Sequence, residues 1–155
     1  WSGKYLNYSK EHRLLAPQAG AMGAGVPAAL AAKSIFPNRQ VICFAGDGDF
    51  QMSASELGTA MQESLNPIIL IHNNGSYGTI RMHQEMRYPK RVSGTNLKNP
   101  NFKCIAEAYN FGYSKITNLS EFKVAFEKAK TIDVGFIIEM LADIKDISPG
   151  KIIDL

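Results

Sequence analysis

Two short, continuously apolar runs dominate the hydrophobic pattern of the chain, at residues 40–45 and 67–72. Each run is too short for an amphipathic helix and ends in turn-forming residues, which is typical of strands buried on both faces. Residues 135–141 have the same character, and residues 13–16 and 112–116 are two further strand candidates. The pattern therefore predicts three buried strands and as many as two more.

Between these runs, apolar residues recur at helical spacing. Residues 21–36 are rich in Ala and Gly, and Pro27 stands where the first turn of a helix tolerates it. Residues 52–64 and 102–109 each carry an apolar stripe, and a third stripe follows Ser120, the expected N-cap. Strands that alternate with helices predict an α/β fold, a three-layer sandwich with a mainly parallel sheet covered on both faces.

Composition places the chain among soluble globular domains. Its 155 residues fit one domain, with 45% hydrophobic and 20% charged residues. A net charge of +3 without a basic stripe argues against a nucleic-acid partner. No apolar stretch approaches the roughly 20 residues that span a bilayer, so we expect no membrane association.

The compartment and the extent of the protein follow from other residues. Cys43 and Cys104 are far apart and are interpreted as two buried thiols, which suits a reducing cytoplasm. The sequence starts at Trp1 without an initiator Met and without a signal-peptide pattern. We therefore expect residues 1–155 to form a single domain of a longer cytoplasmic enzyme.

Oxygen-bearing side chains follow the first two buried strands. Asp47 comes directly after one strand and Asn74 after the next, 27 residues later. Ligands of open α/β sheets bind beyond the carboxyl ends of the strands. Mg²⁺ prefers oxygen ligands in octahedral geometry and is usually held by one or two protein groups together with phosphate oxygens. The pair therefore predicts a metal–diphosphate site.

The glycines beside Asp47 agree with a bound diphosphate. Gly46 and Gly48 suit a backbone that turns sharply and approaches a ligand closely. The free N–H groups of residues 49–51, at the start of the next helix, would face diphosphate oxygens. Alternatively, Asp47 only caps that helix and residues 73–75 only form a turn, and for either motif alone this is the preferred interpretation. Their coincidence at two neighbouring strand ends favours the metal–diphosphate site.

Residues 46–48 (Gly-Asp-Gly), 24 intervening residues and residues 73–74 (Asn-Asn) resemble the signature of thiamine-diphosphate enzymes. Residues 20–29, 46–52 and 139–143 are similar in placement to segments of the acetolactate synthase-like branch. The resemblance covers nearly the whole chain. It implies the C-terminal, diphosphate-binding domain of such an enzyme, with thiamine diphosphate and Mg²⁺ as cofactors.

The resemblance implies roles for individual residues. Asp47, the Asn74 side chain and the Ser76 carbonyl would be the Mg²⁺ ligands. Met22 would be the apolar wedge beneath the bent cofactor, although a Met is otherwise more often core filler. The Gly20 carbonyl and the Met22 N–H would bond the aminopyrimidine. The expected cofactor-binding residues are Gly20, Met22, Gly46, Gly48, Asp49, Asn74, Ser76 and Tyr77.

The implied activity is decarboxylation and/or carboligation of 2-keto acids, because the thiazolium ylid attacks a carbonyl and then acts as electron sink. The glutamate that activates the aminopyrimidine belongs to an N-terminal pyrimidine-binding domain of the same or a partner subunit, and no residue here matches it. We therefore expect an inactive fragment of a homodimer or homotetramer. The alternatives are a non-catalytic phosphate- or nucleotide-binding module, against which the missing Gly-x-Gly-x-x-Gly and Walker lysine count, and an inactive structural subunit.

Three positions depart from that branch. Asp49 stands where relatives more often carry Gly, Ser or Ala, and a second carboxylate near a diphosphate weakens binding unless it points outward or is paired. This residue is the main support for an inactive subunit. Thr79 and His83 stand where anabolic acetolactate synthases carry Met and Trp facing the acceptor pocket.

The same region supplies two catalytic candidates, His83 and Gln84. His83 would polarise a substrate or relay a proton, and the alternative is a histidine on a helix surface. Gln84, with Tyr77 and the basic loop at residues 87–91, would close over an anionic substrate. The alternative for that loop is a solvated charged surface.

Overall fold

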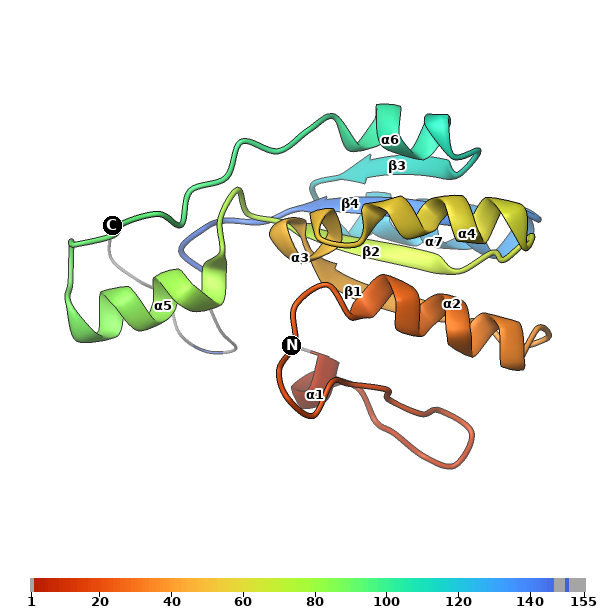
Figure 1. The fold of residues 1–155 in the computed structure, drawn as a ribbon, viewed down its shortest axis with the longest axis horizontal. Coiled ribbons are helices and arrows are strands. Elements are labelled where there is room, and N and C mark those ends of the chain that lie inside the picture. The colour runs from red at the N-terminus through yellow and green to blue at the C-terminus, as the bar shows by residue number, and fades with distance from the viewer. Residues whose placement is uncertain (1, 147–149, 151–155) are drawn as a thin grey trace.

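A sheet of parallel strands forms the centre of the computed structural model, which describes residues 2–146 and 150 (Figure 1). The strands are β1 (Ile42–Gly46), β2 (Ile68–Asn73), β3 (Gly112–Ile116) and β4 (Phe136–Leu141), arranged in the order β1-β2-β4-β3. The parallel α/β sandwich expected from the hydrophobic pattern is confirmed. Trp1, on which the expectation of a longer polypeptide rests in part, lies outside the described residues.

The helices connect the strands as parallel crossovers require. They are α1 (Ser2–Tyr5), α2 (Gly25–Ile35), α3 (Asp47–Gln51), the 3₁₀ turn η1 (Ala54–Glu56), α4 (Leu57–Gln62), α5 (Gly78–Arg87), α6 (Phe102–Ala108) and α7 (Leu119–Thr131). Pro27 is the third residue of α2, within its first turn as expected. None of the helices described here has the length and apolar character that crossing a membrane requires.

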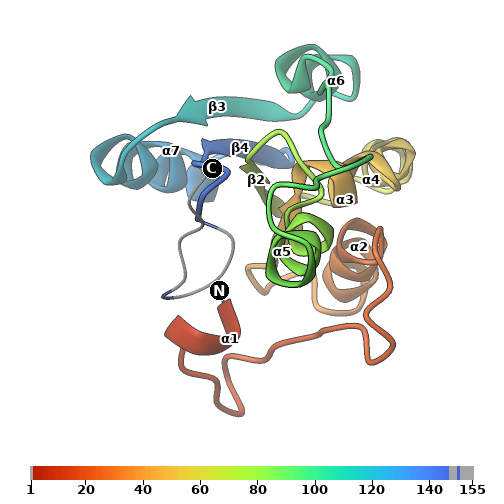
Figure 2. The same cartoon turned by 90° about the vertical axis from the view of Figure 1, so that its left-hand side faces the viewer.

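The two faces of the sheet are covered unequally. On one face α2, α3, α4 and α6 bury a large apolar cluster, in which the rings of Phe50 and Phe102 meet edge to face at 5.6 Å. On the other face α7 packs over β3 and β4 (Figure 2). Ile42 and Phe44 of β1 remain 36% and 46% exposed. The expectation that helices cover both faces therefore fails beside β1.

The register of the sheet brings the two polar motifs to one edge. Gly46, the last residue of β1, is aligned with His72 of β2. Asp47 and Asn73 follow directly, so the chain leaves both strands at the same carboxyl edge. Figure 1 shows α5 standing beyond this edge, apart from the helices that cover the sheet.

Several local expectations are wrong. Residues 13–16 form no strand, because Leu14 and Leu15 lie in an exposed irregular segment. Residues 52–64 are divided between a turn, η1 and α4 rather than forming one helix. Cys104 is exposed, and of the two cysteines Cys43 alone is buried.

The N-cap of α7 is Asn118, not Ser120. The side chain of Asn118 accepts the backbone N–H of Glu121 at 3.0 Å, and the Glu121 carboxylate accepts the N–H of Thr117 at 2.7 Å. The first contact satisfies a helix donor that lacks a partner within the helix, and the second ties the residue before the N-cap to the first turn. Ser120 lies two residues too late for the role.

Candidate metal–diphosphate site

Asp47 is the buried centre of the site, with 1% of its surface exposed at the start of α3. Its Oδ2 accepts the backbone N–H of Gly75 at 2.8 Å and the Nδ2–H of Asn99 at 2.6 Å. Its Oδ1 accepts the adjacent N–H of Gly48 at 3.0 Å. A buried carboxylate needs such donors to offset its lost hydration. Oδ2 is engaged twice from outside α3, which leaves Oδ1 the better placed oxygen for a metal.

The Asn-Asn turn beyond β2 supplies the second half of the site. The Asn74 Oδ1 accepts the N–H of Ser76 at 3.0 Å, so the side chain folds back over its own turn. Gly75 provides the positive φ of 66° that this turn needs. A Cβ on Gly78 would lie 2.8 Å from the Asn74 Nδ2. Gly78 therefore leaves room for the Asn74 side chain.

Gly48 is required by a close approach of side chains. A Cβ at this position would lie 2.5 Å from Cε1 of Tyr77 and 3.0 Å from Cδ1 of Leu97. The Tyr77 ring therefore packs directly on the first turn of α3. A Cβ on Gly46 would meet the Asp49 Cβ at an ordinary 3.9 Å, so of the two glycines beside Asp47 Gly48 alone is sterically constrained.

A strap, which we define as residues 93–99, fastens the Asn-Asn turn from outside. The Ser76 hydroxyl donates to the Thr95 carbonyl at 2.8 Å, and the N–H of Tyr77 donates to the same oxygen at 2.9 Å. The N–H of Leu97 donates to the Gly75 carbonyl at 2.8 Å. Within the irregular connection between α5 and α6, the strap is thus bound along its length.

The carboxylate of Asp49 has a hydrogen-bond partner within the chain. Its Oδ1 accepts the backbone N–H of Gly23 at 2.6 Å. The carboxylate therefore satisfies a donor of the loop that precedes α2. Near it, the thiol of Cys43 is buried, and burial together with the charge of Asp49 raises the pKa of Cys43 to about 12.

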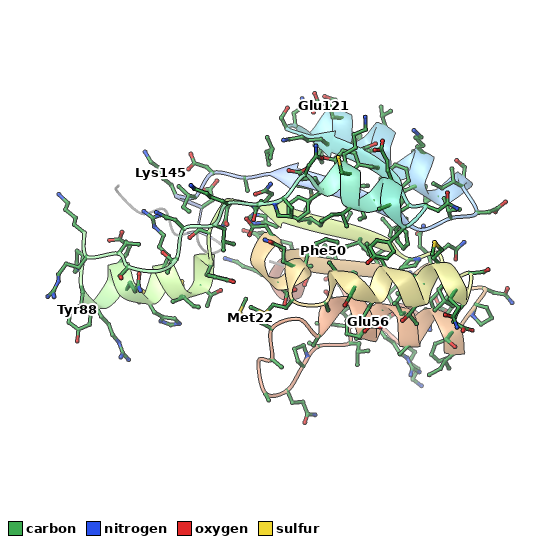
Figure 3. The ribbon with its side chains drawn as sticks, turned by 45° about the horizontal axis from the view of Figure 1, so that its top comes forward. Met22, Phe50, Glu56, Tyr88, Glu121 and Lys145 are labelled. Carbon is green, nitrogen blue, oxygen red and sulfur yellow. The ribbon has the colours of Figure 1, made fainter. Side chains whose placement is uncertain are left out.

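Met22 belongs to what we call the Met22 segment, residues 20–23. It is 45% exposed and stands out from its loop (Figure 3). Gly20 and Gly23 have φ values of 63° and 81°, so the segment depends on glycine. An exposed Met is not core filler, although its role as a wedge stays a prediction.

The two catalytic candidates on α5 lie in different surroundings. His83 is exposed to solvent. The Gln84 amide pairs with the backbone of Ser93, donating to its carbonyl at 2.8 Å and accepting its N–H at 3.1 Å. Gln84 therefore holds the start of the strap, and the structure does not bring His83 or Gln84 against Asp47.

The sequence predicted no role for three side chains of the site, those of Gln51, Asn99 and Glu139. Glu139 was detectable as a single acid in the apolar run of residues 135–141. It is 4% exposed and accepts hydrogen bonds from the Asn73 Nδ2 at 2.7 Å and from the Tyr113 hydroxyl. Burial, and then this contact with Glu139, raise the pKa of Tyr113.

The oxygen donors at this edge suit a hard cation completed by phosphate. Within residues 2–146 and 150, no group of three or more His, Cys, Asp or Glu is placed to hold a metal. The ligands expected from the sequence are the Asp47 carboxylate, the Asn74 amide and the Ser76 carbonyl, all of which would offer oxygens. Mg²⁺ accepts such a partial set when substrate phosphates supply further ligands. The residues therefore fit Mg²⁺ bound together with a diphosphate.

Comparison with known proteins agrees with this chemistry. Residues 1–140 match the family model described as "Thiamine pyrophosphate enzyme, C-terminal TPP binding domain". The chain is 37% identical over 131 residues to the acetolactate synthase large subunit of Pyropia yezoensis, covering 83% of this chain and 22% of that protein. It is 30% identical over 145 residues to the acetolactate synthase isozyme 2 large subunit of Escherichia coli K12, covering 92% and 26%. The chain thus spans about a quarter of the relatives it matches.

A solved structure shares the fold. The thiamine diphosphate-dependent 4-hydroxybenzoylformate decarboxylase of Rhodococcus jostii RHA1 matches with a TM-score of 0.76 and 30% sequence identity. The match covers 81% of this chain and 24% of that one. Similarity in sequence and in fold therefore point the same way.

Proposed function

Since this chain belongs to the thiamine pyrophosphate enzymes, as a C-terminal TPP-binding domain, we propose that it anchors the cofactor of a Mg²⁺-dependent enzyme acting on 2-keto acids. The family assignment confirms the resemblance found in residues 46–48 and 73–74, and with it thiamine diphosphate as the cofactor. The observation that carries the proposal is the buried, pre-oriented carboxylate of Asp47 beside the Asn74 turn.

In this proposal the residues of the chain bind and orient. Asp47, Asn74 and the Ser76 carbonyl would hold Mg²⁺, which in turn holds the diphosphate. Gly48 permits the close packing of Tyr77 at that position, and Met22 would support the cofactor from below. When bound, thiamine diphosphate supplies the thiazolium carbon that attacks a carbonyl and the ring that accepts its electrons.

The reaction class comes from the relatives. They include acetolactate synthases and a 4-hydroxybenzoylformate decarboxylase. We therefore propose decarboxylation and/or carboligation of a 2-keto acid. On α5, exposed His83 is our candidate for contact with the substrate, and Gln84 would act through Ser93 and the strap.

The alternative of an inactive structural subunit loses its main argument. It relied on Asp49 placing an unpaired carboxylate near the diphosphate. The Asp49 carboxylate instead binds the Gly23 N–H at 2.6 Å. No observation favours a nucleotide-binding module over a thiamine-diphosphate domain.

We propose further that residues 1–155 form one domain of a larger, homodimeric or homotetrameric cytoplasmic enzyme. Exposed Met22 and the uncovered Ile42 and Phe44 offer apolar surface to an N-terminal pyrimidine-binding domain of the same or a partner subunit. That domain would supply the activating glutamate. Cys43 and Cys104 are free thiols, as a reducing cytoplasm requires.

Calorimetry of the full-length protein with thiamine diphosphate, with and without Mg²⁺, tests the proposal. We expect metal-dependent binding that Asp47→Ala weakens at least tenfold, because the variant loses a charged metal ligand. The control is Asp133→Ala, which removes an exposed carboxylate elsewhere. Metal-dependent binding that survives Asp47→Ala would overturn the proposal. A panel of 2-keto acids with product identification then assigns the substrate.

A further inference from the structure

Asn99 lies at the centre of a hydrogen-bonded network that joins three parts of the fold. Its Nδ2 donates to the Asp47 Oδ2 at 2.6 Å and to the Asn73 Oδ1 at 2.8 Å. Its Oδ1 accepts the Gln51 Nε2–H at 2.9 Å. One side chain from the strap thus links the ends of β1 and β2 with the last residue of α3.

These partners fix the orientation of the Asn99 amide. Two of them, Asp47 and Asn73, present oxygens, whereas Gln51 presents an N–H. A flipped amide would set its oxygen against two oxygens and its N–H₂ against an N–H₂. The network therefore permits only one orientation, and that orientation directs two donors at the oxygens beside the metal site.

We propose that Asn99 is a positioning residue of the metal site, which holds Oδ2 of Asp47 so that Oδ1 faces the cation. This inference rests on the proposed function, because it needs Asp47 to be a metal ligand. Asn99 does not itself touch the metal. It limits the rotation of the carboxylate, which Gly75 holds from the other strand end, so that less motion is lost when the ion binds.

The network continues from β2 to the neighbouring strand β4. Asn73 accepts from Asn99 and donates to the buried carboxylate of Glu139 on β4 at 2.7 Å. Lys115 of β3 lies 3.6 Å from the same carboxylate. Contacts with the centre of the sheet, and not the strap alone, therefore fix the position of Asn99.

The test compares Mg²⁺ affinity in full-length variants by calorimetry at saturating thiamine diphosphate. We expect Asn99→Ala to weaken Mg²⁺ binding about 10–100-fold, as is typical when a hydrogen-bond partner of a metal ligand is removed. Asn99→Leu, which fills similar space without donors, should show the same loss. Asn96→Ala is the matched control, because Asn96 lies in the same strap and its side chain accepts from Arg81 instead.

A second variant covers the case in which Asn99→Ala fails to fold. Gln51 is exposed, and Gln51→Ala removes the contact that orients the Asn99 amide at 2.9 Å together with a longer hydrogen bond to the Asp47 carbonyl at 3.3 Å. We expect a loss of a few fold in Mg²⁺ affinity. Melting of the metal-free protein separates the roles further. A purely structural Asn99 would lower the melting temperature while Mg²⁺ affinity stayed at the level of Asn96→Ala, and this result would overturn the inference.

Different results would contradict the proposed function and the positioning role of Asn99. If the wild-type protein binds no Mg²⁺ with thiamine diphosphate, the proposed function itself fails. If the wild type binds and Asp47→Ala does not, while Asn99→Ala and Asn99→Leu bind like Asn96→Ala, only the positioning role of Asn99 fails. In the double variant of Asp47→Ala and Asn99→Ala, we expect no loss beyond that of Asp47→Ala, because Asn99 acts through Asp47.

Discussion

The strap and the Met22 segment are both irregular, both border the cofactor site, and are held very differently. The strap is bound to the Asn-Asn turn through Thr95 and Leu97 and to Asp47 through Asn99. The Met22 segment is exposed and is anchored where Gly23 meets Asp49.

This difference indicates which half of the proposed site the chain would build alone. Metal ligands must stand in a fixed geometry, so their surroundings are cross-linked before the ion arrives. As the proposed wedge, Met22 would act against a cofactor whose other end another domain would hold. If another domain completes the site around Met22, Met22 should be exposed in this chain, as it is. If this chain alone holds the metal, Asp47 should be buried among its own residues, as it is.

Gly48→Ala should have the largest effect, because it disturbs the hydrogen-bonded half of the site around Asp47. The new Cβ would overlap the Tyr77 ring, and overpacking of this kind costs about 2–3 kcal/mol. We expect a corresponding loss in the free energy of unfolding and loss of measurable binding of thiamine diphosphate. Denaturant unfolding and calorimetry measure the two effects.

Gly58→Ala in α4 is the control for that variant. A Cβ at Gly58 would meet Tyr109 at 3.5 Å, an ordinary contact, so alanine should be neutral or slightly stabilising within the helix. If Gly48→Ala behaves like Gly58→Ala, the contact with Tyr77 does not constrain the site.

Asp49→Ala should loosen the Met22 segment and spare the metal half. Removing the acceptor of the Gly23 N–H should weaken the binding of thiamine diphosphate about tenfold, or ~1.4 kcal/mol. The affinity for Mg²⁺ should change less than twofold. Asp49→Asn keeps an acceptor and should bind nearly as the wild type does. Equal losses in the two variants would instead assign the effect to charge.

Glu139→Gln should have a smaller effect, confined to the strap side. The amide still accepts from Asn73 but loses the charge that Lys115 and the Tyr113 hydroxyl face, at a cost of about 1 kcal/mol in unfolding free energy. Mg²⁺ affinity should fall less than in Asn99→Ala. A loss of thiamine diphosphate binding larger than that of Asp49→Ala would contradict this order.

Alkylation of Cys43 should be the slowest of the reactions tested. It reports on the buried packing around Cys43, close to Asp49. With the pKa of Cys43 near 12 instead of 9.0, its thiolate fraction at pH 8 is about a thousandfold lower. Iodoacetamide should therefore label exposed Cys104 and not Cys43, as peptide mass spectrometry can show. The sign follows from deprotonation, because labelling of Cys43 should rise about tenfold per pH unit up to its pKa. Equal labelling of Cys43 and Cys104 at pH 8 would mean that the packing around Cys43 opens to solvent.

The sequence predicted the strands and the metal pair because both leave local signals. Continuous apolar runs marked β1, β2 and β4, and the polar residues that follow β1 and β2 located the carboxyl edge. Asn99 left no such signal, since its role depends on a strap that folds back over 52 residues to reach Asp47. The division of residues 52–64 and the incomplete cover of β1 also depend on tertiary packing, which periodicity does not record.

A high-resolution structure of the full-length protein with Mg²⁺ and thiamine diphosphate tests the pre-formed metal half most directly. We predict Mg²⁺ about 2.0–2.1 Å from Oδ1 of Asp47 and from the Asn74 amide oxygen. Oδ2 of Asp47 should still accept from Gly75 and Asn99, with the strap unmoved. A metal bound without Asp47, or through Oδ2 with Asn99 displaced, would contradict the assignment.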